Sequence, residues 1–218
     1  MKVFAISGWK QSGKDTSANY LVKEYGFKRF GFADVLKDMV AEQYGIPREH
    51  CDSSDFKEKA ILTMPVETKD AFGKIIHTFM QKEFRDQNGI KYGSGDTNSV
   101  LYWTPRALCI LEGSIKRSAT SNYWVSKVVS EIKKSEGNYV ISDLRYKSEV
   151  EQLKKAFGED LTLVRVNRFK DTEATDPSER DLDDYDFDVY IDNYESSLQS
   201  LHKDLNELMT FEKVEKLK

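Results

Sequence analysis

The stretch Gly8-Trp9-Lys10-Gln11-Ser12-Gly13-Lys14-Asp15-Thr16 decides how the chain folds. It follows a short apolar run, Val3–Ile6, and it precedes a segment with helical periodicity. The spacing Gly-x4-Gly-Lys between a strand and a helix is that of a Walker A phosphate loop. Its glycines let backbone amides turn toward an anion, and the helix N-terminus adds partial positive charge. The stretch therefore predicts a site for the phosphates of ATP.

The cation of this loop is Lys14. We expect its ammonium group to contact the β- and γ-phosphate oxygens, while Lys10, Ser12 and Gly13 complete the loop around the phosphates. The alternative is a glycine turn followed by an exposed lysine, and the strand-loop-helix context disfavours it. Lys14 is therefore predicted both to bind ATP and to take part in catalysis.

The residue after this lysine departs from the consensus. Asp15 stands where a Ser or Thr hydroxyl normally ligates magnesium, and Thr16 follows it. A carboxylate suits Mg2+, which is a hard cation, so both residues are predicted metal residues, with Asp15 acting directly or through water. Thr16 is also placed to bond the α-phosphate. The alternative for Asp15 is an acid in the first turn of a helix, where the macrodipole favours it.

Short apolar, β-branched runs alternate with helical segments along the rest of the chain. Strands are expected at Val3–Ile6, Phe27–Phe30, Tyr139–Ile141, Leu161–Val166 and Val189–Ile191. Helices are expected at Lys14–Tyr25, Asp34–Tyr44, Pro105–Lys116, Tyr123–Lys134, Lys147–Phe157 and Ser197–Met209. The alternation predicts a three-layer α/β fold, in which helices cover both faces of a five-stranded parallel sheet.

Two polar regions interrupt this rhythm, and each is longer than an ordinary connection. We expect one domain over residues 1–218, with its core at 1–44 and 104–209. The first interruption, about 45–103, is interpreted as an insert and contains the turn-rich stretch Gly89–Asp96. The second, about 168–187, is interpreted as a lid that excludes water from the reaction. Five acids in Asp181–Asp188 argue against a phosphate clamp along this whole segment.

Composition narrows the function classes. The 33 basic and 37 acidic residues give a net charge of -4, so the chain lacks the basic footprint of a nucleic-acid binder. The N-terminal apolar run is too short for a membrane span or a secretory signal. Cys51, Cys109 and the three histidines lack metal-ligand spacing. We therefore expect a cytoplasmic protein with reduced thiols and with no membrane or nucleic-acid partner.

Chemistry-bearing residues also follow the strand Asn138–Ser142. Asp143 ends this strand, at the carboxyl edge of the sheet where ligands bind in open α/β folds. Motor proteins often place a second acid next, but here Leu144 stands in that position. Arg145 is expected to extend toward the phosphates as a catalytic charge stabiliser. Glu149 is expected on the same helix face, where it either fixes the Arg145 guanidinium or forms only a surface pair.

Two further cations are candidates for binding the acceptor. Arg106 follows Pro105 at a helix start, and Thr104 is the expected N-cap. A guanidinium in this first turn suits bidentate binding of a 5′-phosphate. Lys37 lies on the helix after the second strand, and its alternative reading is an exposed helical lysine.

Several motifs occur in a characteristic order: Gly-Lys-Asp-Thr in the loop, Thr104-Pro105-Arg106 with Gly113, Trp124, Asp143-Leu144-Arg145 with Glu149, and Ser178-Glu179 followed by Asp192-Asn193. Together they resemble the phage-type deoxynucleoside monophosphate kinases, a branch of the P-loop nucleoside monophosphate kinase fold. The resemblance implies that ATP, with Mg2+, phosphorylates a deoxynucleoside 5′-monophosphate and yields the diphosphate and ADP. It also implies a role in nucleotide supply to DNA synthesis, in the host cytoplasm if the protein is phage-encoded.

The resemblance implies a substrate site as well. Its members here are Lys37, Arg106, Gly113, Ser114, Trp124, Asp143, Arg145 and Glu149. Trp124 either stacks on the nucleotide base or belongs to the core, and Asn193 either borders the adenine of ATP or is a turn residue. Gly113-Ser114 stands where the family usually has Gly-Thr, and Cys109–Glu112 replaces a glutamine-containing stretch. These departures bear on which bases are accepted.

Other functions stay open on the sequence alone. A phosphate loop also fits a kinase for another small phosphorylated metabolite, such as a phosphomevalonate or dephospho-coenzyme A kinase. A non-catalytic nucleotide switch is a third reading, although Asn167–Asp171 does not match the Asn-Lys-x-Asp pattern of a guanine-reading switch. The sequence also leaves open whether the protein forms a homodimer.

Overall fold

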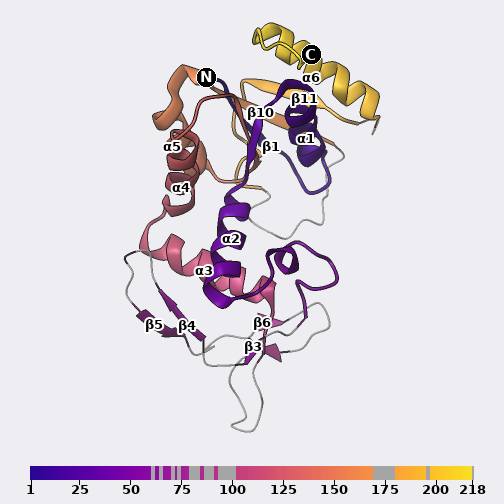
Figure 1. Cartoon of the computed structure of the whole chain (residues 1–218). Coiled ribbons are helices and arrows are strands. Elements are labelled where there is room, and N and C mark those ends of the chain that lie inside the picture. Colours follow the sequence, from indigo (N-terminus) through magenta and orange to yellow (C-terminus); the bar gives the residue numbers. More distant parts are fainter. Residues whose placement is uncertain are drawn as a thin grey trace. The chain divides into compact units, whose positions relative to one another are not determined.

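The computed structural model describes residues 1–59, 62–63, 66–69, 72, 75–78, 84–85, 91–92, 102–168, 180–194 and 197–217 (Figure 1). Most of the stretch Gly89–Asp96, and residues 169–179 of the expected lid, lie outside this part of the chain. Ser178-Glu179, one of the family motifs, lies outside it as well. Among the described helices, none is both long enough and apolar enough to cross a membrane.

Five parallel strands form the central sheet, as predicted. They are β1 (Val3–Ser7), β2 (Lys28–Phe30), β9 (Tyr139–Leu144), β10 (Leu161–Asn167) and β11 (Val189–Asp192). Their order is β11-β10-β1-β9-β2, and every neighbouring pair is parallel. Strand β1 lies at the centre and is buried along its whole length, which explains its unbroken apolar run. Its last residue, Ser7, pairs with Arg165 on one side and Leu144 on the other.

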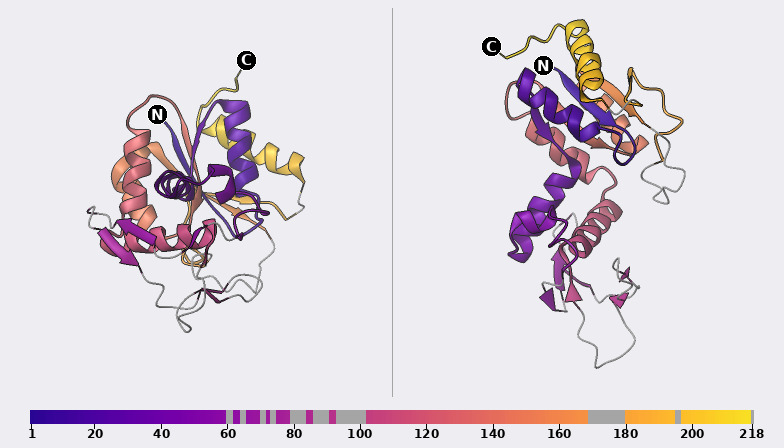
Figure 2. Two further views of the ribbon diagram at one scale, coloured as in Figure 1. Left: turned by 60° about the horizontal axis from the view of Figure 1, so that its bottom comes forward. Right: turned by 90° about the vertical axis from the view of Figure 1, so that its right-hand side faces the viewer.

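Helices cover this sheet on both faces. The helices α1 (Lys14–Tyr25) and α6 (Leu198–Phe211) lie on one side, and α5 (Lys147–Phe157) lies on the other (Figure 2). On the first side, Phe4 and Ile6 of β1 share a core cluster with Leu21 of α1 and Leu205 of α6. The three-layer α/β fold predicted from the alternation of elements is therefore confirmed.

Helix bounds agree closely with the periodicity of the sequence. The bounds of α1 and α5 are those predicted, α2 (Phe32–Tyr44) begins earlier, α3 (Pro105–Ala119) extends further and α4 (Tyr123–Ile132) ends earlier than expected. Thr104 is the N-cap of α3, because its side chain accepts a hydrogen bond from the Ala107 amide at 3.1 Å. Pro105 occupies the first turn, as the sequence indicates.

The chain divides into two compact units. The first comprises Met1–Ala33 and Val125–Lys218, and the second comprises Asp34–Trp124. The unit boundaries fall inside α2 and α4 and therefore differ from the expected bounds of the insert. The acceptor-binding role of the insert and the closing role of the lid remain predictions.

Within the second unit, α2, α3 and the short helix η1 (Arg48–Cys51) surround a core that includes Val40, Trp103 and Leu108. Three antiparallel pairs of short strands occupy the polar region that the sequence marks only by its turns. They are β3 (Leu62–Thr63) with β8 (Tyr102–Trp103), β4 (Val66–Lys69) with β5 (Ile75–Thr78), and β6 (Phe84–Arg85) with β7 (Lys91–Tyr92).

Candidate active site

The phosphate loop joins β1 to α1 and is folded back on itself. The Ser12 amide donates to the Trp9 carbonyl at 3.0 Å, and the Lys14 ammonium donates to the same carbonyl at 3.2 Å. Gly13, at the start of α1, has φ +109°, and a Cβ there would lie 2.7 Å from Nδ2 of Asn193. Only glycine fits this position. Lys14 is largely buried, and no side chain caps the helix through Gly13, so the loop matches an anion site at a helix N-terminus.

Asn193 holds the loop from the end of β11. Its Nδ2 donates to the Ser12 carbonyl at 2.8 Å, and its backbone amide donates to the Asn167 carbonyl at 2.8 Å. This contact with the loop backbone is a role that sequence reasoning missed, and the proposed contact with adenine stays a prediction. In the described part of the chain, the buried Ser12 hydroxyl has no hydrogen-bond partner. A phosphate oxygen would satisfy it.

A cavity of about 310 Å³ lies beside the loop. Its lining includes Gly13, Lys14, Asp15, Thr16 and Asn193 from the predicted ATP site. Arg168 adds a second cation, while Leu198 and Leu201 of α6 add apolar surface. A charged end beside an apolar end suits a ligand that combines phosphate with a base. Lys10 is exposed on the loop and does not line this cavity.

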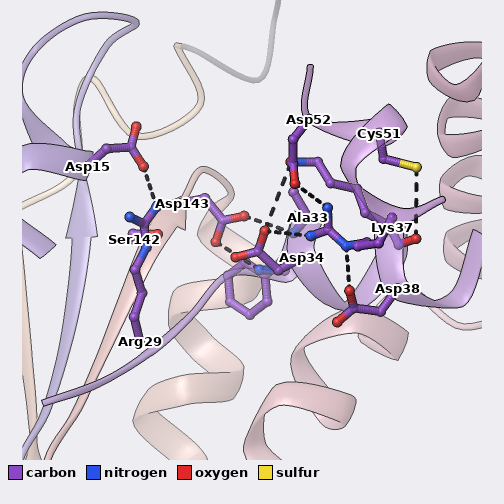
Figure 3. Close-up of polar contacts among 12 residues, drawn as sticks. Asp15, Arg29, Ala33, Asp34, Lys37, Asp38, Cys51, Asp52, Ser142 and Asp143 are labelled. Carbon is purple, nitrogen blue, oxygen red and sulfur yellow. Dashed lines mark hydrogen bonds and ion pairs between the residues drawn. The ribbon is translucent and has the colours of Figure 1, made fainter. Parts of the chain in front are cut away.

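Arg29 on β2 holds the Asp15 carboxylate, with Nη2 2.5 Å from Oδ1 (Figure 3). The same guanidinium donates to Ser142 at 3.0 Å and to Asn19 at 2.6 Å. Sequence reasoning missed Arg29, although its place on a strand paired with β9 offered a signal. Asp15 is 66% exposed, so one carboxylate oxygen can be held by Arg29 while water reaches the other.

A magnesium ion at the phosphate loop would have few protein ligands among the described residues. No group of three or more His, Cys, Asp or Glu side chains among the described residues has the arrangement of a metal site. Mg2+ at nucleotide sites commonly takes one or two carboxylates and completes its shell with phosphates and water. The exposed Asp15 carboxylate fits that pattern, with Thr16 on the same helix.

Asp143 anchors the N-terminus of α2. Its two carboxylate oxygens accept hydrogen bonds from the backbone amides of Phe32 and Ala33, each at 2.9 Å (Figure 3). These bonds explain why α2 begins before Asp34, because they satisfy amides that the helix leaves unpaired. The residue lies at the carboxyl end of β9, as expected, but the helix anchor is a role that the sequence did not reveal.

Glu149 caps α5. Its carboxylate accepts from the backbone amides of Arg145 at 2.9 Å and Tyr146 at 3.0 Å. Two expectations are therefore corrected. Arg145 precedes α5 and does not share a helix face with Glu149, and Glu149 is buried, so its interaction is not a surface pair. The proposed contacts of Glu149 and Arg145 with substrate stay predictions.

In the second unit, Lys37 and Arg48 form a charged cluster with three aspartates (Figure 3). Lys37 is 2.7 Å from Asp52, and Arg48 contacts Asp34, Asp38 and Asp52. Partial burial acts to raise the pKa of Asp52, but hydrogen bonding by Lys37 and the charge of Arg48 lower it below the usual value. Arg48 was not predicted, and Lys37 is engaged by carboxylates rather than freely exposed.

Arg106 is likewise paired, because its Nε donates to the Glu58 carboxylate. Its side chain is 46% exposed, and its amide donates to the Lys57 carbonyl at 3.0 Å. The segment 52–58 thus supplies the counter-ions of Lys37 and Arg106, the two cations predicted to bind the acceptor.

Gly113 and Trp124 lie in contact. The indole nitrogen of Trp124 donates to the Gly113 carbonyl at 3.5 Å, and the indole is buried. A Cβ at Gly113 would lie 3.3 Å from a Leu36 methyl, so the glycine permits close packing of α3 on α2. These contacts support the core reading of Trp124, while its stacking on a base stays a prediction. The neighbouring Ser114 is exposed.

Comparisons with known proteins bear on the first part of the chain. The family model described as "Deoxynucleotide monophosphate kinase" matches residues 2–71. Among solved structures, a gluconokinase from Sinorhizobium meliloti 1021 is 12% identical, with 96% of each chain covered and a TM-score of 0.36, a likeness too weak for any argument. No curated protein matches. The family to which the sequence motifs point is thus the one whose model matches, over a stretch that includes the phosphate loop, Asp15 and Lys37.

Proposed function

We propose that this chain transfers the γ-phosphoryl group of ATP, with Mg2+, to a deoxynucleoside 5′-monophosphate. The family whose model matches is one that phosphorylates deoxynucleotide monophosphates. The single observation that carries the choice of ATP as donor is the phosphate loop. There the largely buried Lys14 opens α1, and the nearby Ser12 hydroxyl has no hydrogen-bond partner among the residues that the structure describes.

When ATP binds, the phosphate loop would exchange hydrogen bonds within itself for hydrogen bonds to the phosphates. Lys14 donates to the Trp9 carbonyl, a neutral acceptor, and this bond is readily exchanged for one to a β- or γ-phosphate oxygen. The backbone amides of the loop and of the first turn of α1 would bind the remaining oxygens. Because phosphoryl transfer places negative charge on these oxygens, the same donors stabilise the transition state.

Mg2+ would neutralise charge between the β- and γ-phosphates, and Asp15 and Thr16 are the residues proposed to hold it. Arg29 supports this role, because it fixes the position of the Asp15 carboxylate. Arg145 is proposed to stabilise charge on the transferring group. Direct in-line transfer needs no covalent enzyme intermediate.

The acceptor phosphate is proposed to bind Lys37 and Arg106. An incoming phosphate would have to replace Asp52 on Lys37 and Glu58 on Arg106. Replacement of one carboxylate by a phosphate conserves the ion pair, and it offers the Arg106 guanidinium a bidentate partner. A role in nucleotide supply to DNA synthesis follows from the product.

A steady-state coupled assay tests this function. ATP, Mg2+ and the purified chain are combined with each deoxynucleoside monophosphate, each ribonucleoside monophosphate, phosphomevalonate or dephospho-coenzyme A. We expect ADP formation that depends on at least one deoxynucleoside monophosphate. Turnover with a non-nucleotide acceptor alone would instead support another metabolite kinase. Slow ADP formation that no acceptor accelerates would support a nucleotide switch.

A further inference from the structure

The acidic run Asp181–Asp188 lies at the C-terminal end of the expected lid and is not part of the proposed phosphate chemistry. In the structure its carboxylates tie neighbouring elements together. Asp181 accepts from the Lys147 amide at 2.7 Å, at the start of α5, and Asp184 pairs with the Lys147 ammonium at 2.7 Å. Asp188 accepts from the Leu163 amide of β10 at 2.8 Å. The run therefore fixes the chain that leads from the expected lid into β11.

One member of this run, Asp183, reaches the phosphate loop. Its Oδ1 accepts from the indole nitrogen of Trp9 at 2.7 Å and from Nη2 of Arg165 at 2.6 Å. Arg165 in turn donates to the Ser7 hydroxyl at 3.1 Å, at the last residue of β1. The Arg165 side chain is only 10% exposed, so Asp183 is its close counter-ion in a largely buried setting. Asp183 thus joins the strand before the loop to the first variable residue of the loop.

The other end of the expected lid also touches the loop. Arg168, just after β10, donates from Nη1 to the Gln11 carbonyl at 2.9 Å. Gln11 has φ +63°, a left-handed conformation that is unfavourable for a residue other than glycine. An outside hydrogen bond to this peptide helps to hold the conformation. Arg168, before residues 169–179, and Asp183, after them, are therefore both hydrogen-bonded to the phosphate loop.

We propose that Trp9 and Asp183 are positioning residues, whose hydrogen bond couples the acidic run Asp181–Asp188 to the conformation that the phosphate loop needs for ATP. The inference rests on the proposed function, because it assigns the loop to ATP. Neither residue need touch the reacting atoms. The bond fixes Trp9, whose carbonyl accepts from both the Ser12 amide and the Lys14 ammonium. A loose Trp9 would therefore misplace the cation that binds the phosphates.

The substitution Trp9→Phe tests the coupling most cleanly, since it removes the N–H donor, keeps an aromatic ring and leaves the Asp183–Arg165 pair intact. We expect the Kd for Mg·ATP, measured by titration calorimetry on the full chain, to rise by about 5- to 10-fold, as for the loss of one hydrogen bond of ordinary net strength at a solvent-exposed position. The KM for ATP should rise in parallel, while kcat, the KM for the acceptor and the melting temperature stay near those of the parent. Asp184→Asn is the matched control. Asp184 belongs to the same run, is 75% exposed and pairs with Lys147, which does not contact the phosphate loop in any bond described here. The Kd for Mg·ATP should therefore stay that of the parent.

A double-variant cycle tests whether the effect passes through the proposed bond. Asp183→Asn should also raise the Kd for Mg·ATP. The double variant, Trp9→Phe with Asp183→Asn, should have a Kd no higher than that of the single variant that binds Mg·ATP less tightly. Additive losses would overturn the coupling, as would a folded Trp9→Phe variant with the Kd of the parent. A parent that binds no Mg·ATP would overturn the proposed function itself, and with it the role of both residues.

Discussion

The two compact units differ in how they hold the cations assigned to phosphate binding. In the first unit, Lys14 donates to a backbone carbonyl of its own loop. In the second, Lys37 and Arg106 are paired with the carboxylates of Asp52 and Glu58. A bond to a neutral carbonyl is exchanged for phosphate at little electrostatic cost, whereas a carboxylate must be displaced. On the proposed function, the loop is therefore ready to bind ATP, whereas an acceptor phosphate would have to displace Asp52 and Glu58 from the cations proposed to bind it.

The largest effect is expected in the first unit. Lys14→Ala should lower kcat/KM by about 100- to 1,000-fold, because the loop loses its charge on the β- and γ-phosphates. Lys23→Ala is the control, since Lys23 lies on the same helix and is 83% exposed. Steady-state assays of both variants check this. A Lys14→Ala variant with the kcat/KM of the parent would show that Lys14 does not act on the phosphates of ATP.

In the second unit, removal of a buried charge should affect stability. Glu112 is fully buried, 3.3 Å from the Lys116 ammonium, and accepts from Gln43 and Tyr44. Glu112→Gln should lower the free energy of unfolding by about 3 kcal/mol, because it removes a buried negative charge that is paired with the buried Lys116 ammonium. Urea unfolding measures this.

The control for that substitution is Glu207→Gln, which breaks the exposed pair with Lys203 and should change stability by less than about 1 kcal/mol. Equal losses of unfolding free energy in the two variants would mean that the buried Glu112 pair stabilises the fold no more than an exposed pair does.

A smaller effect tests the competing carboxylates directly. Glu58→Gln should lower the KM for the deoxynucleoside monophosphate by about 2- to 5-fold and leave the KM for ATP unchanged, because Arg106 no longer exchanges one anion for another. Glu49→Gln, which changes an exposed acid in η1 of the same unit, is the control and should change neither KM. A rise in the acceptor KM would show that Glu58 positions Arg106 for the acceptor and does not compete with it.

The last effect, which appears only at high pH, concerns the two thiols of the second unit. Burial, together with the neighbouring Cys51, raises the pKa of Cys109 from 9.0 to about 12. As pH rises, the Cys109 thiol therefore loses its proton in the unfolded chain before it does so in the folded protein. The contribution of the neutral thiol to the free energy of unfolding is fully present below pH 9 and is lost as pH rises toward 12.

The difference in unfolding free energy between the parent and Cys109→Ala should thus shift against the parent by about 1 kcal/mol between pH 8 and pH 10. Urea unfolding at the two pH values measures it. A constant difference would mean that Cys109 ionises normally in the folded protein.

The features that sequence reasoning recovered are local. Apolar runs and helical periodicity gave all five strands of the sheet and the bounds of α1 and α5. Thr104 and Pro105 marked the start of α3, because capping depends on neighbours in the chain. The phosphate loop was readable for the same reason, since one strand, one turn and one helix suffice to build it.

The features that were missed depend on contacts between distant residues. Asp183 lies 174 positions from Trp9, and Asp143 lies 111 positions from Phe32, so no local pattern links them. The strands of the second unit are mostly two residues long, too short for a clear alternation. Glu149 is different, because an acid in the first turn of α5 is a capping signal that is readable from the sequence alone.

The most direct test of the central claim follows the phosphoryl group itself. ATP labelled at the γ-phosphate is mixed with Mg2+, an accepted deoxynucleoside monophosphate and an excess of the protein, and the products of one turnover are separated. We expect the label to appear in the β-phosphate of the deoxynucleoside diphosphate, in amounts equal to the ADP formed. Label recovered in inorganic phosphate, with the monophosphate unchanged, would contradict it.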